Sequence, residues 1–354
     1  MEPRAVSPSP SSTQSLYGSS REATGSSNTE TSTSGPGQSL TNRRSIVLVR
    51  AASAKARPQE LTTRDIGILT ALDRYRYLDT DQIRQLFFQG QRRCQLRLKW
   101  LAQNDLAIRW LAMEPPGWTR RHSVYALSPA GARVLAARLN EDPRIYVRRS
   151  QHAIHHQNHL LHDLEANGFF VALATTHQPA ERGLWSWVGE DGCRRTYRQR
   201  GDHLTPDGFG RYLVRDRQIL LHLEWDRGTE SPQRIADKAR SYVRHFAGRQ
   251  QAEYNNILFV APQPGREGSL NEAILRAAPT WARACCTFWT TNLPLLRSVG
   301  VLGQAWFPVL NSHPEEVRSC LVDMPSLEYA RFAIDDCIGA DSWWERRLRG
   351  GESA

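Results

Sequence analysis

The apolar pattern between residues 61 and 139 constrains the fold more than any other feature of the chain. Apolar residues first recur at helical spacing, with residue types typical of helix caps at the ends of each run. This pattern predicts three helices, which start near Thr62, Asp79 and Gln91. Two strands and a further helix are expected next, at 107–113, 122–127 and 128–139. Pro and Gly between the two strands mark the tip of a hairpin.

The order helix, helix, helix, hairpin, helix is the winged-helix arrangement. Its third helix is strongly basic and contains no acidic residue between Gln91 and Asn104. Cys94, Leu98 and Leu101 recur at i, i+4 and i+7 and so predict the buried face of this helix. A helix that is apolar on one side and basic on the other can enter a major groove, where Arg pairs with guanine edges or phosphates. The segment 61–140 therefore predicts a domain that binds double-stranded DNA.

The DNA-binding candidates are the basic side chains of the third helix and of the hairpin tip, namely Arg92, Arg93, Arg97, Lys99, Arg120 and Arg121. We expect Arg93 and Arg97 to project away from the buried face and to contact bases. Arg92 and Lys99 are expected at the other margin of that face, and the hairpin tip is expected to touch the DNA backbone or minor groove. The alternative is a basic, solvated helix in a protein–protein module.

The charge balance of the 354 residues fits the same partner. The formal net charge is +10, which suits a polyanion, although a basic solvated surface has the same sign. Residues 1–58 are rich in Ser, Thr, Gly and Pro, so they predict a disordered tail with a basic end. The apolar patch at 46–49 inside this tail is interpreted as incidental, with a partner-docking strand as the alternative.

Cysteine usage and hydropathy indicate the compartment. The six cysteines form no C-x-x-C pair, which argues against a zinc ribbon or a thioredoxin-like site. They are typical of reduced thiols, and no secretory signal is recognised at the start of the sequence. Apolar runs stay well below the roughly 20 residues that span a bilayer. We therefore expect a cytoplasmic protein with no membrane partner.

The second half of the chain alternates between helical and strand-like segments. Helices are expected at 152–167, 232–246 and 271–278, and strands at 169–173, 184–188, 209–214, 219–225, 254–260 and 285–289. Strands that alternate with helices indicate an α/β domain. The expected organisation is thus a tail at 1–58, a winged helix at 59–141, a basic linker at 142–151, an α/β domain at 152–310 and a C-terminal extension at 311–354.

Acidic residues on a predicted strand pair suggest a metal site. Asp207 precedes one strand, and Glu224 and Asp226 share one face of the next because side chains alternate along a strand. Asp207 and Glu224 could converge on one Mg²⁺ or Mn²⁺ ion, which would activate water for phosphodiester hydrolysis. The alternatives are that Asp207 is a turn residue and that the other two acids pair with neighbouring arginines.

The pattern Pro206-Asp207 followed by Glu224-x-Asp226 resembles the motif of the PD-(D/E)xK nuclease superfamily. The resemblance implies an α+β or α/β fold class, in which the N-terminal winged helix is followed by a mixed α/β restriction-endonuclease-like core. It also implies catalytic roles for Asp207, Glu224, Asp226 and a lysine. Asp226 occupies the position where the superfamily has its lysine, and Lys238 on the following helix is the candidate substitute. An active and a catalytically reduced site both stay open.

A second resemblance covers about residues 60–262. The predicted winged helix, the segment His155 to Leu161 and the block Glu224-Trp225-Asp226-Arg227-Gly228-Thr229-Glu230 resemble the replication-relaxation family of bacterial plasmid and integrative-element proteins. Lys238 and Tyr242 lie downstream of that block and belong to the same pattern. The resemblance implies a role in plasmid replication, or in the relaxation or mobilisation of plasmid DNA.

A cluster of histidines lies between the two predicted domains. His155, His159 and His162 would share one face of the helix expected at 152–167, where zinc could bind. A polar helix face near the carboxylates is the favoured interpretation. The sequence contains no ATP-binding loop of the Gly-x-x-x-x-Gly-Lys-Ser/Thr type, and it offers no support for a relaxase with a catalytic tyrosine.

Three functional hypotheses follow from these patterns. The first is a DNA-binding replication or mobilisation protein whose nuclease-like domain is coupled to a winged helix. The second is an active Mg²⁺- or Mn²⁺-dependent endonuclease, and the third is a winged-helix transcriptional regulator. Expected partners are double-stranded DNA and other replication or mobilisation proteins, and a homodimer stays open.

Overall fold

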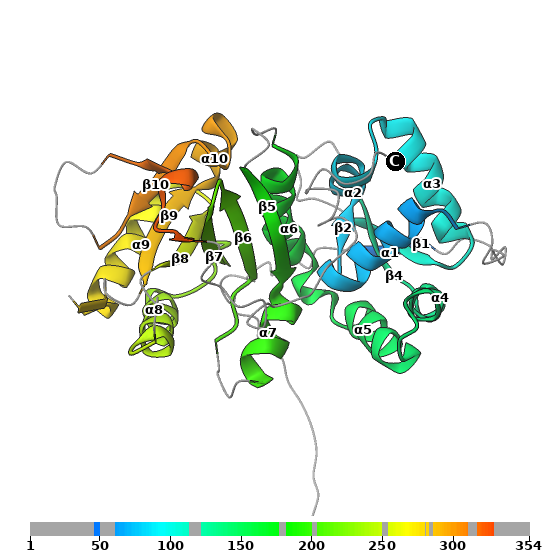
Figure 1. The fold of residues 1–354 in the computed structure, drawn as a ribbon, viewed down its shortest axis with the longest axis horizontal. Coiled ribbons are helices and arrows are strands. Elements are labelled where there is room, and N and C mark those ends of the chain that lie inside the picture. Colours follow the sequence, from blue (N-terminus) through cyan, green and yellow to red (C-terminus); the bar gives the residue numbers. More distant parts are fainter. Residues whose placement is uncertain are drawn as a thin grey trace, which may run out of the picture. The chain divides into compact units, whose positions relative to one another are not determined.

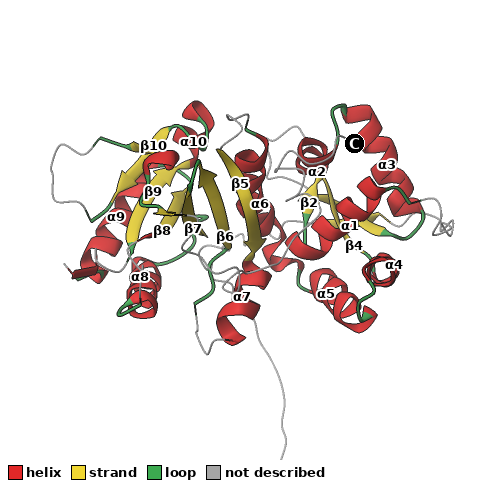
Figure 2. Cartoon of the chain, viewed as in Figure 1, coloured by secondary structure: helices red, strands yellow, loops and turns green. Residues whose placement is uncertain are grey.

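A computed structural model of the chain describes residues 46–49, 61–112, 122–176, 182–199, 204–249, 254–279, 281–282, 286–310 and 317–328. Two compact units divide the chain, residues 1–43 and 44–354, and all described residues lie in the second. The second unit is mixed, with a small antiparallel sheet and a larger mixed sheet that are surrounded by helices (Figures 1 and 2). This confirms the predicted α+β fold class.

The first part of the second unit has the predicted order of elements, to which the structure adds a two-residue strand between the first two helices. It comprises α1 Thr63–Tyr75, β2 Leu78–Asp79, α2 Thr80–Phe87, α3 Gln91–Gln103, β3 Ala107–Ala112, β4 His122–Leu127 and α4 Pro129–Leu139. Thr62 and Asp79 each close a capping box, in which the cap side chain and the third helical residue satisfy each other's backbone amides. Cys94, Leu98 and Leu101 form the buried face of α3, as their spacing predicts.

The small sheet has the order β1-β3-β4-β2, and its first strand corrects one interpretation of the sequence. The apolar patch is strand β1, Ile46–Val49, which pairs antiparallel with β3 from Ile46 opposite Ala112 to Val49 opposite Arg109. The patch is therefore not incidental. Its neighbour is a strand of its own chain, which satisfies the backbone groups at that sheet edge.

Helices α5 and α6 connect the small sheet to the larger one. The basic segment predicted as a linker forms most of α5, Pro143–His155, whose N-cap is Asp142. A 3₁₀ turn at Gln157–His159 then separates α5 from α6, Leu160–Thr175. One continuous helix at 152–167 was therefore a wrong prediction, and its three histidines do not share one helical face.

Helix α6 also replaces a predicted strand. Gly168 was expected to end the helix and residues 169–173 to form a strand, but α6 continues through both. Phe169, Phe170 and Leu173 are buried in the main core, so tertiary packing outweighs the local helix-stop signal and the β preference of the aromatic residues. Phe170 packs directly on Gly208 and Gly210, where any larger side chain would overlap its ring.

The larger sheet has eight strands in the path β11-β10-β9-β8-β7-β6-β5, with β12 beside β7. Its strands are β5 Arg182–Gly189, β6 Gly208–Val214, β7 Arg217–Trp225, β8 Asn255–Ala261, β9 Thr287–Asn292, β10 Gln304–Pro308, β11 Ser319–Cys320 and β12 Leu327–Glu328. Its helices are α7 Glu190–Gln199, α8 Pro232–Phe246, α9 Pro264–Ala277 and α10 Leu293–Val299. Strands β7, β8 and β9 are parallel, and the flanking pairs are antiparallel.

The central strands are buried on both faces, as is usual for parallel strands covered by helices. Leu258 and Val260 of β8 belong to the core on the α6 side, whereas Ile257 and Phe259 belong to the core beneath α8 and α9. Helix α7 was not predicted, because its apolar residues are few and its helical character depends on packing against β5 and β6. Among the described residues, no helix has the length and apolarity needed to cross a membrane.

Candidate functional site

The hairpin β6–β7 brings Asp207 beside the end of β7. The backbone amide of Asp207 donates to the carbonyl of Leu223 at 2.9 Å, which extends the ladder by one residue. The carboxylate of Asp207 accepts the backbone N–H of Trp225 at 2.7 Å. Burial acts to raise the pKa of Asp207, but hydrogen bonding and charge from His162, together with Lys238, hold it below its usual value. Asp207 is thus the ionised partner in a buried site rather than a turn residue.

Glu224 lies on the face of β7 that α8 covers, where Oε1 accepts a hydrogen bond and Oε2 lies in an ion pair. Lys238 Nζ is 2.8 Å from Oε2, and the hydroxyl of Tyr242 donates to Oε1 at 2.6 Å. Burial, which outweighs the opposing charge of Lys238, raises the pKa of Glu224 to about 7. Lys238 also contacts Glu230 at 3.0 Å. The structure therefore brings together Asp207, Glu224 and Lys238, three of the four residues predicted as catalytic.

Asp226 is the predicted catalytic residue that is bound elsewhere. Its carboxylate accepts Arg266 Nε at 2.5 Å and the backbone amide of Gly228 at 2.8 Å. Arg266 lies on α9 and also donates to the carbonyl of Glu230, so it ties the loop after β7 to that helix. This ion pair gives Asp226 a structural position. The pairing of Asp226 with an arginine was foreseen from the sequence, but its partner was not.

His162 also belongs to the site, as one of the histidines that the sequence placed on a polar helix face near the carboxylates. Its Nε2 lies 3.0 Å from the carbonyl oxygen of Trp225 and 3.2 Å from Asp207 Oδ2. Because both neighbours are acceptors, Nε2 carries a proton. Burial lowers the pKa of His162, but the hydrogen bond and charge of Asp207 dominate and raise it to about 9. His155 and His159 are exposed instead. We define His162, Asp207, Glu224, Lys238 and Tyr242 as the carboxylate cluster.

A divalent cation does not fit the carboxylate cluster as it is arranged. The oxygens of Glu224 are engaged by Lys238 and Tyr242, and Oδ2 of Asp207 is engaged by the Trp225 amide and His162. Within the described ranges, no group of three or more His, Cys, Asp or Glu side chains is placed to hold a metal ion. An ammonium and an imidazolium supply the positive charge that a metal ion would bring.

On α3, the outward face differs from the one expected. Arg92, Gln95, Leu96 and Lys99 are exposed there, and Leu96 keeps 59% of its surface accessible. Arg93 is also exposed. Arg97 instead donates from Nε to Asp65 Oδ1 at 2.7 Å and lies 3.9 Å from the Trp100 ring centroid. The reason is angular, since Arg97 lies only about 70° from the centre of the buried face at 100° per residue.

The other candidate DNA-binding residues lie at the predicted tip of the hairpin. Arg120 and Arg121 lie outside the described residues, between β3 and β4. Of the predicted DNA-binding residues, those that are described all lie on α3.

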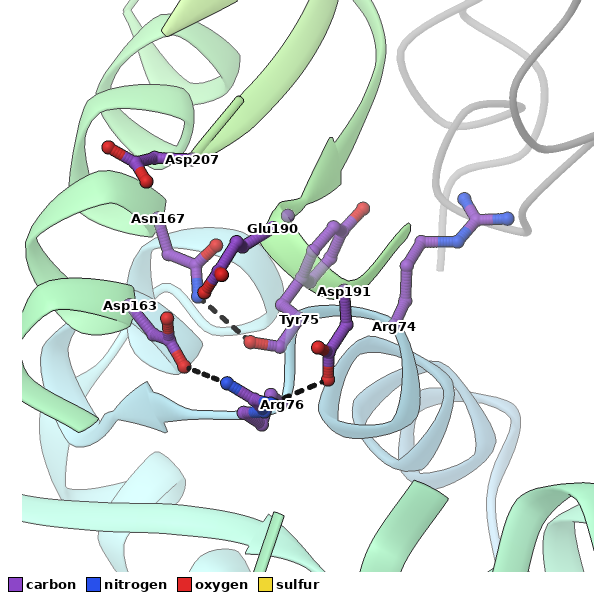
Figure 3. A pocket seen from close by; sticks show the side chains of 9 residues that line it. Arg74, Tyr75, Arg76, Asp163, Asn167, Glu190, Asp191 and Asp207 are labelled. Carbon is purple, nitrogen blue, oxygen red and sulfur yellow. Dashed lines mark hydrogen bonds and ion pairs between the residues drawn. The ribbon is translucent and has the colours of Figure 1, made fainter. Parts of the chain in front are cut away.

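A small pocket adjoins the carboxylate cluster (Figure 3). Its charged lining includes Arg74, Arg76, Asp163, Glu190, Asp191 and Asp207. Arg76 donates to Asp163 and pairs with Asp191, each at 2.8 Å. Its backbone has φ 66° and ψ −56°, and the Tyr77 amide donates to the Tyr75 carbonyl at 2.7 Å, which defines a γ-turn. The side-chain amide of Asn167 on α6 donates to the carbonyl of Tyr75 at 2.9 Å and to the carbonyl of Tyr77 at 3.0 Å.

Comparison with known proteins gives one match. A family model described as Replication-relaxation matches residues 69–260, which is more than half of the chain. No curated protein and no solved structure matches. The matched region runs from α1 to β8 and contains α3 and every residue of the carboxylate cluster.

Proposed function

Because the chain belongs to the replication-relaxation family, we propose that it binds double-stranded DNA through a winged-helix unit formed by α1 to α4. Family membership indicates a role in the replication or relaxation of plasmid or mobile-element DNA. In this proposal the winged helix targets the chain to DNA, and the α/β part carries a nuclease-like carboxylate cluster. Other replication or mobilisation proteins and a second copy of the chain are the remaining candidate partners.

The observation that carries the proposal is the outward face of α3. Arg92, Arg93 and Lys99 are exposed there. The opposite side of the helix is buried and consists of Cys94, Leu98 and Leu101. A helix held by one face against a compact unit can present the other to a major groove. Exposed cations on that face can neutralise phosphates and release counterions, which makes binding dependent on salt.

Two further features support this assignment. The order α1-β2-α2-α3-β3-β4 with a three-stranded pairing β3-β4-β2 is that of winged-helix proteins. Leu96 stands at the centre of the exposed basic face, where a solvated helix would favour a polar residue. An apolar side chain in that position can contact the methyl group of thymine.

The test is titration of a fluorescent random-sequence duplex at several salt concentrations. The double variant Arg92→Ala/Lys99→Ala should bind at least tenfold more weakly, and its log–log salt slope should fall by about 2. The matched control, Arg133→Ala/Arg244→Ala, removes the same charge from exposed positions on α4 and α8. Equal losses in the two double variants would contradict a binding face on α3.

The second candidate function is an endonuclease, and one observation favours it. Asp207, Glu224 and Lys238 converge from two strands and a helix, in the combination that the nuclease motif requires. The ion pairs of the cluster would have to open before a cation could enter. This function is tested by incubating supercoiled plasmid with Mg²⁺ or Mn²⁺, beside the variants Asp207→Ala and Glu224→Ala. Nicking that both variants abolish supports the enzyme, and intact plasmid under conditions of DNA binding contradicts it.

A further inference from the structure

A second pocket lies beside the one in Figure 3, and four of its ten lining residues are arginines. It is open to solvent and lies among residues of α1, α5 and α7. Its charged lining consists of Asp73, Arg74, Arg76, Arg149, Asp191 and Arg195. Four guanidinium groups therefore face two carboxylates, and the lining has an excess of positive charge.

Both carboxylates of this lining are already engaged. Asp73 pairs with Arg149 at 2.6 Å. Asp191 pairs with Arg76 at 2.8 Å through one oxygen and with Arg194 at 3.0 Å through the other. Within the described part of the chain, Asp73 Oδ1 is buried without a hydrogen-bond partner, and the other three carboxylate oxygens of the lining are engaged by Arg149, Arg76 and Arg194.

Arg195 takes no part in these ion pairs. Among the described residues it makes no hydrogen bond or ion pair, although it is exposed and lines the pocket. Desolvation by neighbouring protein atoms, and then the positive charge of Arg149, lower the pKa of Arg195. Asp191 and Asp73 act in the opposite direction without reversing the effect. An anion in the pocket would relieve this repulsion.

We propose that this arginine pocket binds a phosphodiester group of DNA, with Arg195 as its principal ligand and Arg149 beside it. The guanidinium group suits this role, since its fixed N–H donors match phosphate oxygens and its charge persists at every physiological pH. The inference rests on the proposed function, because it takes DNA as the source of the phosphate. It adds a contact on α5 and α7, apart from α3.

The arginine pocket adjoins the pocket of Figure 3, which relates the proposed phosphate contact to the carboxylate cluster. The pocket in Figure 3 shares Arg74, Arg76 and Asp191 with it and reaches Asp207 of the carboxylate cluster. A phosphate held by Arg195 would therefore lie next to the pocket that reaches Asp207. The backbone of a bound strand would be guided from the arginine pocket toward Asp207.

The test uses the full chain and compares two arginines of one helix. Arg195→Ala removes the proposed ligand, and Arg198→Ala removes the same charge from an exposed residue of α7 that does not line the pocket. With a labelled 25-base-pair duplex, Arg195→Ala should bind about tenfold more weakly and lose about 1 from its salt slope. Arg198→Ala should change affinity by less than about twofold, as a surface charge screened by salt. Equal effects of the two variants would overturn the proposal.

A second measurement separates DNA from free phosphate as the source. The melting temperature of each variant is recorded in inorganic phosphate and in chloride at equal ionic strength. A phosphate-dependent rise in the unsubstituted chain and in Arg198→Ala, but not in Arg195→Ala, supports a phosphate site. If that rise occurs while Arg195→Ala binds duplex normally, the assignment to DNA is overturned and the α3 proposal stands. If the unsubstituted chain binds no duplex, the proposed function itself fails.

Discussion

At the residue scale, Arg97 shows how one tertiary contact changes the role of a side chain. In the sequence it belongs to a basic helix face, but in the structure its Nε and Nη2 donate to the two carboxylate oxygens of Asp65 at the start of α1. Burial raises the pKa of Asp65, and hydrogen bonds from Arg97 and Thr62 overcome this and lower it. Arg97 therefore stabilises the contact between α1 and α3, and Arg92, Arg93 and Lys99 remain as the exposed cations of α3 to which we assign the proposed DNA contact.

We expect Arg97→Ala to destabilise the chain by about 2–3 kcal/mol, because the fully buried Asp65 carboxylate would lose its cationic partner. Urea unfolding followed by circular dichroism measures this. Arg93→Ala is the matched control, since Arg93 is exposed on the same helix and its replacement should stay within about 0.5 kcal/mol. Equal stability of the two variants would mean that the Arg97–Asp65 pair contributes nothing.

Arg76 combines a buried ion pair with a strained backbone. Both Arg76→Ala and Arg76→Gly remove the pairs with Asp163 and Asp191, so both should unfold more readily. Glycine adopts positive φ without steric cost, so Arg76→Gly should be more stable than Arg76→Ala by about 1–2 kcal/mol. Thermal unfolding of the pair tests this ranking, and the reverse order would show that the γ-turn does not persist.

At the element scale, two helical glycines differ in whether the packing around them leaves room for a side chain. Gly131 lies where α4 meets the turn before β3, and a Cβ there would overlap the carbonyl oxygen of Leu106. Gly168 lies inside α6, where the nearest atom to an added Cβ is Gln82 Nε2 at 3.4 Å. The first glycine is required by close packing. The second is tolerated by a helix whose buried residues hold it in place.

Substitution by alanine at each position tests whether the glycine is required there. Gly131→Ala should cost about 2 kcal/mol or more, because the backbone of α4 must move away from Leu106. Gly168→Ala should be neutral or stabilising by up to about 1 kcal/mol, since Ala is the better helix former and meets ordinary contact distances. Denaturant midpoints of both variants provide the measurement. A large loss at Gly168 would show that α6 is packed more tightly than these contacts indicate.

At the scale of the whole molecule, His222 joins three elements in the core beneath α8. Its Nδ1 lies 3.2 Å from the Tyr197 hydroxyl of α7, and its Nε2 lies 3.0 Å from Asn255 Oδ1 of β8. The ring is neutral, because Nε2–H donates to the amide oxygen and Nδ1 accepts the hydroxyl proton. Burial lowers the pKa of His222 to about 4.

This shift makes stability fall in acid. The unfolded chain binds a proton at His222 near the ordinary pKa of 6.5, whereas the folded chain resists protonation until about pH 4. The stabilisation is therefore complete above pH 6.5 and is lost as pH falls toward 4, by up to about 3 kcal/mol. Free energies of unfolding at several pH values, for the unsubstituted chain and for His222→Gln, should show this loss in their difference. A difference independent of pH would rule out the neutral buried histidine.

Local patterns determined a large part of this molecule. Capping residues and apolar spacing predicted the elements from α1 to α4, because those signals lie within a few residues of the structure that they specify. Alternation and turn residues likewise predicted β6, β7 and α8, and with them the convergence of Asp207 and Glu224. A role for Lys238 beside them was implied by the resemblance to the nuclease superfamily, and the structure places its ammonium against Glu224. The family resemblance rests on the same local blocks and is confirmed by the match over residues 69–260.

Only the tertiary structure decided which partner each polar side chain takes. Asp226 pairs with Arg266 forty residues later, Arg97 pairs with Asp65, and His162 reaches Asp207 from another helix. The extension of α6 through Gly168 and the addition of β1 to the small sheet have the same origin. A buried charge or backbone group is stable only when a partner lies beside it in space. The distance between two residues along the chain does not reveal whether they become such partners. The sequence alone therefore determined most of the elements and the family, and the packing of those elements decided which charged side chains are paired and which remain exposed.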